Sequence, residues 1–511
     1  MIPIFVGYLA LTVGLGLWQA YKTKSQSDFV LGGSKLPGWM LALSERATGE
    51  SAWLLLGFTG FVYASGLSAI WIGVGCTLGI CTAWIVLARR FRAEAAATGA
   101  LTMPEYFAAR YPRRAATIRA LSTLIITFFF VFYVGAQFAG AGKTIFETFG
   151  LDPAYSQLLA AAVILLYATL GGFVSVVAVD TLQSLLMITT LVVTPIIMLI
   201  MVAGDDQVSI AGALSQAGEG MGSLTGGATG FAAGLLIFNN LAWFFGYLGG
   251  QPQLNARFMG MRDERNVRIG RNIAVVWTVL AYTGVALIGL CALALFGPDA
   301  VPDSEMILPH VLNELFPGWL AAILLAGAVA AMISTAQSML LVASSSISQD
   351  VYQGIIRRGQ ARDRTLLLIS RATTLIIGTL GLMLALTTSD LIYTIVSYAW
   401  AGIGCSFAPA ILLSFYWKRF GSAGLITALL AGIVTTVIWI AWPDLMELIG
   451  RHEWALDLEQ TLTARALTFA VAMGAAVVVT LIRPAPPAEA KPPLPGPEPA
   501  AGDQRSESKK S

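Results

Sequence analysis

Charged side chains are scarce in this chain. Of its 511 residues, 12% are Asp, Glu, Lys or Arg, whereas 56% are hydrophobic. Soluble globular domains carry about 25% charged residues. Apolar runs of about 20 residues, long enough for a helix to cross the hydrocarbon core of a bilayer, recur along the whole length. The composition therefore predicts an integral membrane protein and excludes a soluble globular fold.

Histidine and cysteine are also rare. His310 and His452 are the only histidines, and the four cysteines stand in apolar segments without C-x-x-C spacing. We expect the cysteines to be small buried hydrophobic residues and not disulfides or metal ligands. The sequence contains no nucleophile–base or metal constellation, so we expect neither an enzyme nor a cofactor.

Basic residues do not gather on one predicted face. The net charge is only +2, and Lys and Arg stand in short segments between the apolar runs. A nucleic-acid partner is therefore not expected. Residues 2–21 have no basic n-region and no small-residue cleavage site, so we expect them to be a retained first span.

Thirteen apolar runs predict thirteen membrane-spanning helices. If the N-terminus lies outside, every Lys and Arg except Arg46, Lys143, Arg451 and Arg465 falls in a cytoplasmic loop or in the tail, as the positive-inside rule requires. The C-terminus is then cytoplasmic. The runs lie near 2–21, 37–63, 68–89, 116–146, 154–174, 180–203, 228–250, 271–297, 318–348, 365–387, 390–416, 421–442 and 465–482.

The second run carries the most informative residues, Glu45, Arg46 and Glu50. Ionisable groups at membrane depth are costly and face a partner or a solvated pathway. Hydroxyl residues and a glycine beside them weaken the helix, and a helix that breaks in mid-membrane is how many secondary transporters build a binding site. The alternative is an internal pair between Arg46 and Glu50, four residues apart. That pair needs an unbroken helix through Gly49, which the predicted break argues against.

The seventh run predicts a second break. Asn239 and Asn240 precede an aromatic cluster, and the run ends in Gly-Gly-Gln-Pro at 249–252. In an inverted repeat this run is the partner of 37–63, so we expect an interrupted helix that lines a cavity. The alternative is an asparagine pair that holds neighbouring helices together.

The ninth run predicts half of a small hard-cation site. Ala331, Ser334 and Thr335 share one helix face by their i, i+3, i+4 spacing. Their hydroxyls, with carbonyls freed by the broken second run, can serve as oxygen ligands. The alternative is that both hydroxyls bond to carbonyls of their own helix.

The fourth run places Tyr133 and Gln137 on one face, i and i+4. A buried tyrosine hydroxyl needs a partner, and a substrate is one candidate. The glycines nearby, at 135, 140 and 142, favour close helix packing.

These residues belong to a longer series of motifs, and the chain resembles the sodium/solute symporter family, most closely the bacterial sodium/proline symporters. The resemblance covers roughly residues 25–420. Its motifs are Phe29-Val-Leu-Gly-Gly33, Ala42-Leu-Ser with Trp53-Leu-Leu, Leu101-Thr-Met-Pro-Glu-Tyr-Phe107, Tyr167-Ala-Thr-Leu-Gly-Gly-Phe-Val-Ser175, Gly250-Gln-Pro252, Ala256-Arg-Phe-Met259, Ser334-Thr335 and Ser397-Tyr-Ala-Trp-Ala-Gly402.

The resemblance implies an all-α membrane protein with a five-plus-five inverted-repeat core, two discontinuous helices and alternating access. It implies a cation site between the second and ninth runs, and Asp180 matches an acidic position of the family. The implied sodium ligands are the carbonyls of Ala47, Glu50 and Ala331 and the hydroxyls of Ser334 and Thr335. The expected substrate residues are Ser51, Trp53, Tyr133, Gln137, Trp243, Phe244 and Tyr247.

The chain departs from the family at the first break. Sodium/proline symporters have an aspartate where this chain has Gly49, and an apolar residue where it has Glu50. Three roles for Glu50 follow: it pairs with Arg46, it adds charge to the cation site in place of the aspartate, or it carries a proton. We favour the second, although the Glu50 side chain points about 100° around the helix from position 49.

We therefore expect a sodium-coupled symporter of proline or a similar small amino acid in a bacterial-type plasma (inner) membrane. Its partners are a small-molecule solute, sodium and the lipid bilayer. The alternatives are a proton-coupled symporter of another small organic solute, or a non-transporting sensor on the same scaffold. The expected parts are a first span and loop (1–36), the transport core (37–420), two further spans (421–482) and a disordered, Pro-rich cytoplasmic tail (483–511).

Overall fold

The computed structural model describes residues 2–20, 26–34, 36–388, 391–448 and 462–484, with residues 451, 454 and 458 between the last two ranges. These residues are almost entirely helical and contain no β-strand. Ten helical segments of the described part are long and apolar enough to cross a membrane. The tail predicted to be disordered lies outside the described residues, except for 483 and 484.

The helices follow the predicted apolar runs closely. The first half of the chain contains α1 (Ile2–Ala20), α2 (Gln26–Leu31), α3 (Gly38–Gly49), α4 (Thr59–Ser65), α5 (Ile70–Thr82), α6 (Ala88–Thr98), α7 (Met103–Arg110), α8 (Ala115–Phe149), α9 (Pro153–Leu170), α10 (Phe173–Ala203) and α11 (Ile210–Ala217). The second half contains α12 (Gly230–Leu241), α13 (Trp243–Tyr247), α14 (Pro252–Met259), α15 (Glu264–Phe296), α16 (Ile307–Leu315), α17 (Gly318–Ser345), α18 (Asp363–Thr387), α19 (Ile392–Tyr416), α20 (Ser422–Ile440), α21 (Trp442–Glu447) and α23 (Ala464–Ile482).

The first predicted break is present. Helix α3 ends at Gly49, and the next residue, Glu50, leaves the helical region with φ −106° and ψ 53°. The chain resumes as a wide π-helical segment, Trp53–Phe58, which continues into α4. The break frees backbone groups in the middle of the bundle, where only protein atoms can satisfy them.

The second predicted break lies between α13 and α14. Gly249 there has a φ of 75°, a conformation that favours glycine. Pro252 occupies the first turn of α14, where its missing N–H costs nothing. The backbone passes so close to α19 that a Cβ on Gly250 would lie 1.9 Å from the carbonyl oxygen of Gly404.

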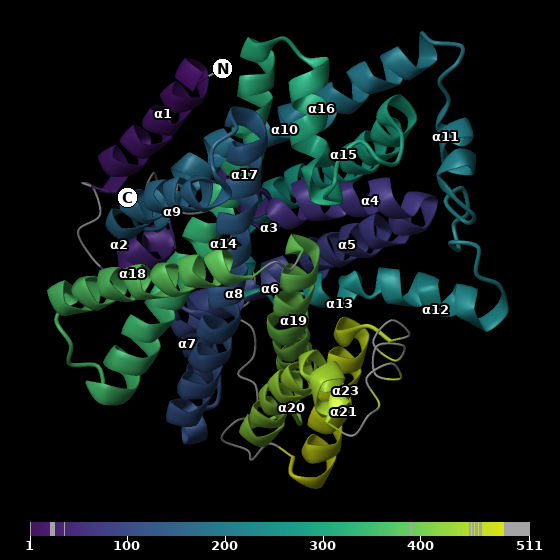
Figure 1. Ribbon diagram of the computed structural model, residues 1–511. Coiled ribbons are helices and arrows are strands. Elements are labelled where there is room, and N and C mark those ends of the chain that lie inside the picture. The colour runs from purple at the N-terminus through teal and green to yellow at the C-terminus, as the bar shows by residue number, and fades with distance from the viewer. Residues whose placement is uncertain are drawn as a thin grey trace, which may run out of the picture.

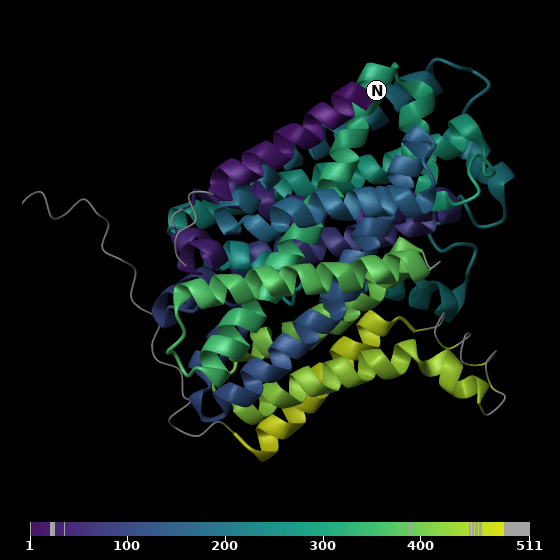
Figure 2. The same ribbon diagram turned by 60° about the vertical axis from the view of Figure 1, so that its left-hand side comes forward.

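Helix α17 is the most deeply buried span. It contacts α3, α8 and α10, and α3 also packs against α10 and α15, so the first broken helix lies among the longest helices (Figure 1). The C-terminal helices α20 and α23 pack against each other and against α19. Figure 2 shows them, in yellow-green, at the edge of the bundle away from the purple α1.

The structure differs from the prediction at two connections. The segment 91–111, which lies between the predicted runs 68–89 and 116–146, is mostly helical, because α6 runs on to Thr98 and α7 follows it. Helix α10 begins at Phe173, well before the predicted 180. The helical stretch Trp53–Thr98 contains the end of the predicted second span and all of the third, joined at Gly66 with a φ of 65°. The count of thirteen spans stays a prediction.

Candidate functional site

Two buried carboxylates share one guanidinium at the end of α3. Arg46 donates from Nε to Glu45 Oε2 at 2.6 Å, also contacts Glu45 through Nη2, and donates from Nη1 to Glu50 Oε1 at 2.8 Å. Its Nη1 also lies 3.2 Å from the Thr278 hydroxyl, and Trp84 Nε1 donates to Glu45 Oε2 at 2.9 Å. With all three groups ionised, this cluster carries one excess negative charge.

The Arg46–Glu50 pair forms even though the helix breaks. The expectation that a break would exclude the pair is wrong, because α3 stays helical through Gly49 and Glu50 is the residue at its end. The N–H of Glu50 still donates to the Arg46 carbonyl at 3.0 Å, so the two side chains remain one turn apart on the same face.

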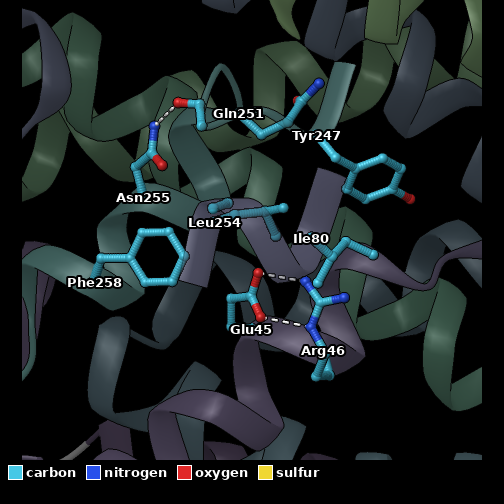
Figure 3. Close-up of a pocket in the computed structure, with 10 residues that line it drawn as sticks. Glu45, Arg46, Ile80, Tyr247, Gln251, Leu254, Asn255 and Phe258 are labelled. Atoms are coloured by element: carbon cyan, nitrogen blue, oxygen red, sulfur yellow. Dashed lines mark hydrogen bonds and ion pairs between the residues drawn. The ribbon is translucent and has the colours of Figure 1, made fainter. Parts of the chain in front are cut away.

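A small cavity adjoins this cluster. Figure 3 shows the Glu45–Arg46 pair facing α14, with Leu254, Asn255 and Phe258 opposite. The volume is about 10 Å³, room for about one water molecule. It cannot hold a solute.

A second buried ion pair joins four helices. Arg257 on α14 donates to Asp180 on α10 at 3.0 Å and to the Ser338 hydroxyl on α17 at 2.6 Å. From α3, the Ser44 hydroxyl donates to Asp180 at 2.6 Å, and Thr48 Oγ1 accepts from Arg257 at 3.0 Å. Arg257, predicted to be a loop residue, therefore lies on a helix with its side chain fully buried against this acid.

One predicted cation ligand, Thr335, contacts the first break. The Thr335 hydroxyl on α17 donates to the Thr48 carbonyl at 2.9 Å, and not to its own helix. The Ser334 hydroxyl is buried and has no hydrogen-bond partner among the described residues. Oxygen ligands of this kind suit a hard cation. The remaining predicted ligands are fully buried as well: Ala47, Glu50 and Ala331.

The helix that resumes after the break is held by α8. The Gln137 side-chain oxygen accepts from the Ala52 backbone N–H at 3.0 Å, which satisfies a donor that the break has freed. Ser51 Oγ and the Tyr133 hydroxyl lie 2.9 Å apart, and Trp400 Nε1 donates to the same tyrosine oxygen at 2.9 Å. Tyr133 therefore ties the break to α19.

An aromatic cluster lies beside these residues. The rings of Trp53 and Trp243 stack at 4.0 Å, and Tyr247 and Trp400 lie 3.9 Å apart. Trp53 Nε1 donates to the Tyr247 hydroxyl at 3.1 Å, and that hydroxyl donates to the Gly49 carbonyl at 3.3 Å. Rings stacked this closely leave no room between them for a solute, so any solute bound here must part them.

Phe244 does not join this cluster. Its side chain is only half-buried, and its ring lies 5.6 Å from Phe245 in an edge contact. Trp243 and Tyr247 are four residues apart and share the inner face of α13, which turns Phe244 outward.

The predicted asparagine pair binds neighbouring segments. Asn240 donates from its side chain to the Ser68 carbonyl at 3.1 Å, and Asn239 accepts from the Thr463 N–H at 3.3 Å. These contacts match the alternative in which the pair holds helices together.

The start of α19 is capped by an acid from the short 3₁₀ segment Ser304–Met306. Glu305 is buried and accepts from the backbone N–H groups of Ile392 at 3.0 Å and Tyr393 at 2.8 Å. Lys143 on α8 lies 2.6 Å from Glu305 and 2.7 Å from Asp303. A carboxylate at a helix N-terminus is favoured by the helix dipole.

A further ion pair links α7, α8 and the π-helical segment Ser346–Ile356. Asp350 is fully buried and accepts from Arg119 at 2.7 Å and from the Thr102 hydroxyl at 2.7 Å. In another part of the fold, the Asp263 carboxylate caps the start of α15, and the backbone N–H of Asn266 lowers the pKa of this acid.

Fold and site together define a membrane transporter built around two interrupted helices. The model of the sodium:solute symporter family matches residues 29–432. The chain is 35% identical over 444 residues to the osmoregulated proline transporter OpuE of Bacillus subtilis, which covers 86% of this chain and 88% of that protein. It is 32% identical over 460 residues to the sodium/proline symporter of Escherichia coli, covering 88% and 90%. The chain therefore belongs to the sodium:solute symporter family.

The fold is shared with a solved Na⁺-coupled sialic acid symporter in a substrate-bound, outward-open state. The TM-score is 0.75 at 19% sequence identity, and the match covers 94% of this chain and 96% of that one. At this identity the likeness establishes the common architecture.

Proposed function

We propose that this chain is a secondary active transporter that carries proline or a similar small amino acid together with sodium, by alternating access. One observation carries the proposal: the hydroxyls of α17 contact the chain just before the break after Gly49, and aromatic side chains contact it just after the break. Thr48 contacts Thr335, and Ser51 contacts Tyr133. Ion and solute that bind to one flexible segment influence each other's affinity, which is what coupling requires.

In this proposal the carbonyls of Ala47, Glu50 and Ala331 and the hydroxyls of Ser334 and Thr335 hold the sodium ion. The unpartnered Ser334 hydroxyl supports the assignment, because a buried polar atom without a partner is costly unless a ligand satisfies it. When the ion binds, the Thr335 hydroxyl turns its oxygen lone pairs to the ion.

The solute is held by the side chains around the break. Ser51, Trp53, Tyr133, Trp243 and Tyr247 supply apolar area and hydroxyl groups, and Gln137 keeps the helix start in place. Solute entry separates Trp53 from Trp243. Relatives named as proline transporters support proline as the first candidate.

The proposed location is the inner membrane of a bacterium, with the N-terminus outside and the C-terminus in the cytoplasm. The distribution of basic residues supports this orientation. Lys143, Asp303 and Glu305 then lie toward the outer side, and Arg119 and Asp350 toward the inner side.

A proton-coupled carrier is the second candidate, and the acid cluster at α3 favours it. Glu50 binds Arg46 through one oxygen only, and its Oε2 is buried without a hydrogen-bond partner among the described residues. Two carboxylates on one guanidinium provide a place where one proton can be held without breaking the pair.

Uptake into proteoliposomes tests both candidates. The purified full-length protein is supplied with a panel of radiolabelled amino acids under an imposed sodium gradient or an imposed proton gradient. We expect accumulation of proline driven by sodium alone. Accumulation driven only by protons establishes the second candidate, and no gradient-driven uptake of any amino acid contradicts both.

A further inference from the structure

Arg465, near the start of α23, is a buried cation without a carboxylate partner in the described part of the chain. Its exposure is 3%, and its Nε has no hydrogen-bond partner among the described residues. Its contacts include the hydroxyls of Ser397 and Tyr393 and the ring of Trp243, whose centroid lies 4.1 Å from the guanidinium carbon. Arg46 and Arg257 are equally buried, yet each contacts an acid.

An arginine in this position is costly. Removing a charge from water is costly, and an opposite charge normally offsets that cost. The Trp243 ring offsets only part of it by cation–π attraction, and neutral hydroxyls add little. The guanidinium also keeps donors in a planar fork that matches the two oxygens of a carboxylate.

The location of Arg465 connects it to the proposed solute site. Trp53 stacks on Trp243 at 4.0 Å, and the guanidinium lies over the same ring at 4.1 Å, so the two must cover opposite faces. Parting the two tryptophans, which solute entry requires, therefore also moves Trp243 relative to Arg465. If solute entry moves Trp243 out from between them, the solute and the guanidinium face each other beside α19.

We propose that Arg465 binds the carboxylate of the transported solute, which replaces Ser397 as acceptor when the aromatic cluster opens. The proposal rests on the proposed function in assuming that the solute binds at this cluster. It names the substrate class by its chemistry: a small solute with a free carboxylate, as in an amino acid. It also gives α23, which lies beyond the matched family region, a part in substrate selection.

A matched pair of ligands tests this directly. L-Proline and L-prolinamide differ only in the carboxylate, and both compete with radiolabelled L-proline for the purified full-length protein. We expect the amide to bind at least 30-fold more weakly to the wild type. Arg465→Met should reduce that ratio at least tenfold, and Arg465→Lys, which keeps the charge without the fork, should reduce it at least threefold. Arg451→Met, at an exposed arginine of the preceding segment, should leave it unchanged.

Size-exclusion chromatography shows which variants are folded. If only Arg465→Lys is folded, its ratio of acid to amide affinity decides whether the proposal holds. A folded variant with the wild-type preference for the carboxylate overturns the proposal. Failure of the proposed function is recognised separately, because it shows in the wild type. If proline does not bind but another amino acid of the uptake panel does, the same acid and amide comparison is made with that amino acid. If the Arg465 variants no longer distinguish that amino acid from its amide, the proposal is upheld without proline. If the wild type prefers the amide, the proposal is rejected.

Discussion

The Thr335 hydroxyl donates a hydrogen bond of 2.9 Å to the carbonyl oxygen of Thr48, one residue before α3 ends at Gly49. A hydroxyl in a helix usually bonds to a carbonyl of its own helix. Here it bonds across to the broken helix. The contact joins the least exposed span to the segment whose backbone is free to rearrange.

Removing the hydroxyls of α17 should weaken the response to sodium. For Ser334→Ala with Thr335→Ala, we expect the sodium concentration for half-maximal uptake to rise at least tenfold, about 1.4 kcal/mol. The control is Ser344→Ala, since Ser344 lies on the same helix and donates to the carbonyl of Leu341 in that helix. Equal sodium dependence in the double variant and the control would contradict the cation assignment.

Truncating the aromatic cluster should raise the solute concentration needed for half-maximal uptake. Trp53→Ala removes the stack on Trp243, and Tyr133→Phe removes the hydroxyl that contacts Ser51. We expect at least a tenfold increase for the first and about threefold for the second. Phe244→Ala, on the outer face of α13, should transport like the wild type. If Phe244→Ala is as damaging as Trp53→Ala, the cluster does not define the solute site.

The acid cluster of α3 should tolerate loss of a carboxylate better than loss of its arginine. Arg46→Gln leaves Glu45 and Glu50 buried without a cation, and breaking a buried pair this way costs about 3–5 kcal/mol. We expect a lower melting temperature for Arg46→Gln than for Glu50→Gln in detergent, and partial recovery when both are changed.

Transport by Glu50→Gln separates the roles of this acid. Weaker sodium dependence with little effect of pH indicates that Glu50 adds charge to the cation site. Loss of uptake driven by a pH gradient indicates a proton carrier. Wild-type uptake at every pH and sodium concentration leaves Glu50 as a structural partner of Arg46 alone.

The capping acid of α19 should matter more than its neighbour. Glu305→Gln removes the charge that faces Lys143 and two backbone N–H groups, and we expect a loss of about 3 kcal/mol in stability. Asp303→Asn alters the other acidic partner of Lys143. Because Asp303 is 27% exposed, this substitution should change the melting temperature little. Equal effects of the two substitutions would show that the cap contributes nothing.

Local pattern was sufficient for the helices and for the first break. The i, i+3, i+4 spacing of Ala331, Ser334 and Thr335 places them on one face of α17, and Thr335 on that face contacts α3. The polar residues around Gly49 predicted the first break for the same reason. Both depend on neighbours within a few residues.

Long-range packing explains what the sequence did not reveal. Arg257 looks like a loop residue until Asp180, 77 residues away, is known to face it. Arg465 is an isolated basic residue at the start of an apolar run, and only the fold brings it to Trp243. Phe244 was misplaced because a five-residue helix presents its inner face according to what packs on it.

The closeness of Gly250 to Gly404 constrains how the molecule can move. A Cβ on Gly250 would overlap the backbone of Gly404, and a Cβ on Gly404 would overlap the backbone of Gly246, so the two segments meet without side chains between them. The two segments cannot slide past each other, since any displacement brings carbonyl against carbonyl or opens a gap within the bundle. The backbone around Gly250 and helix α19 should therefore move as one rigid body during the transport cycle. The bending must then occur elsewhere, at the break after Gly49.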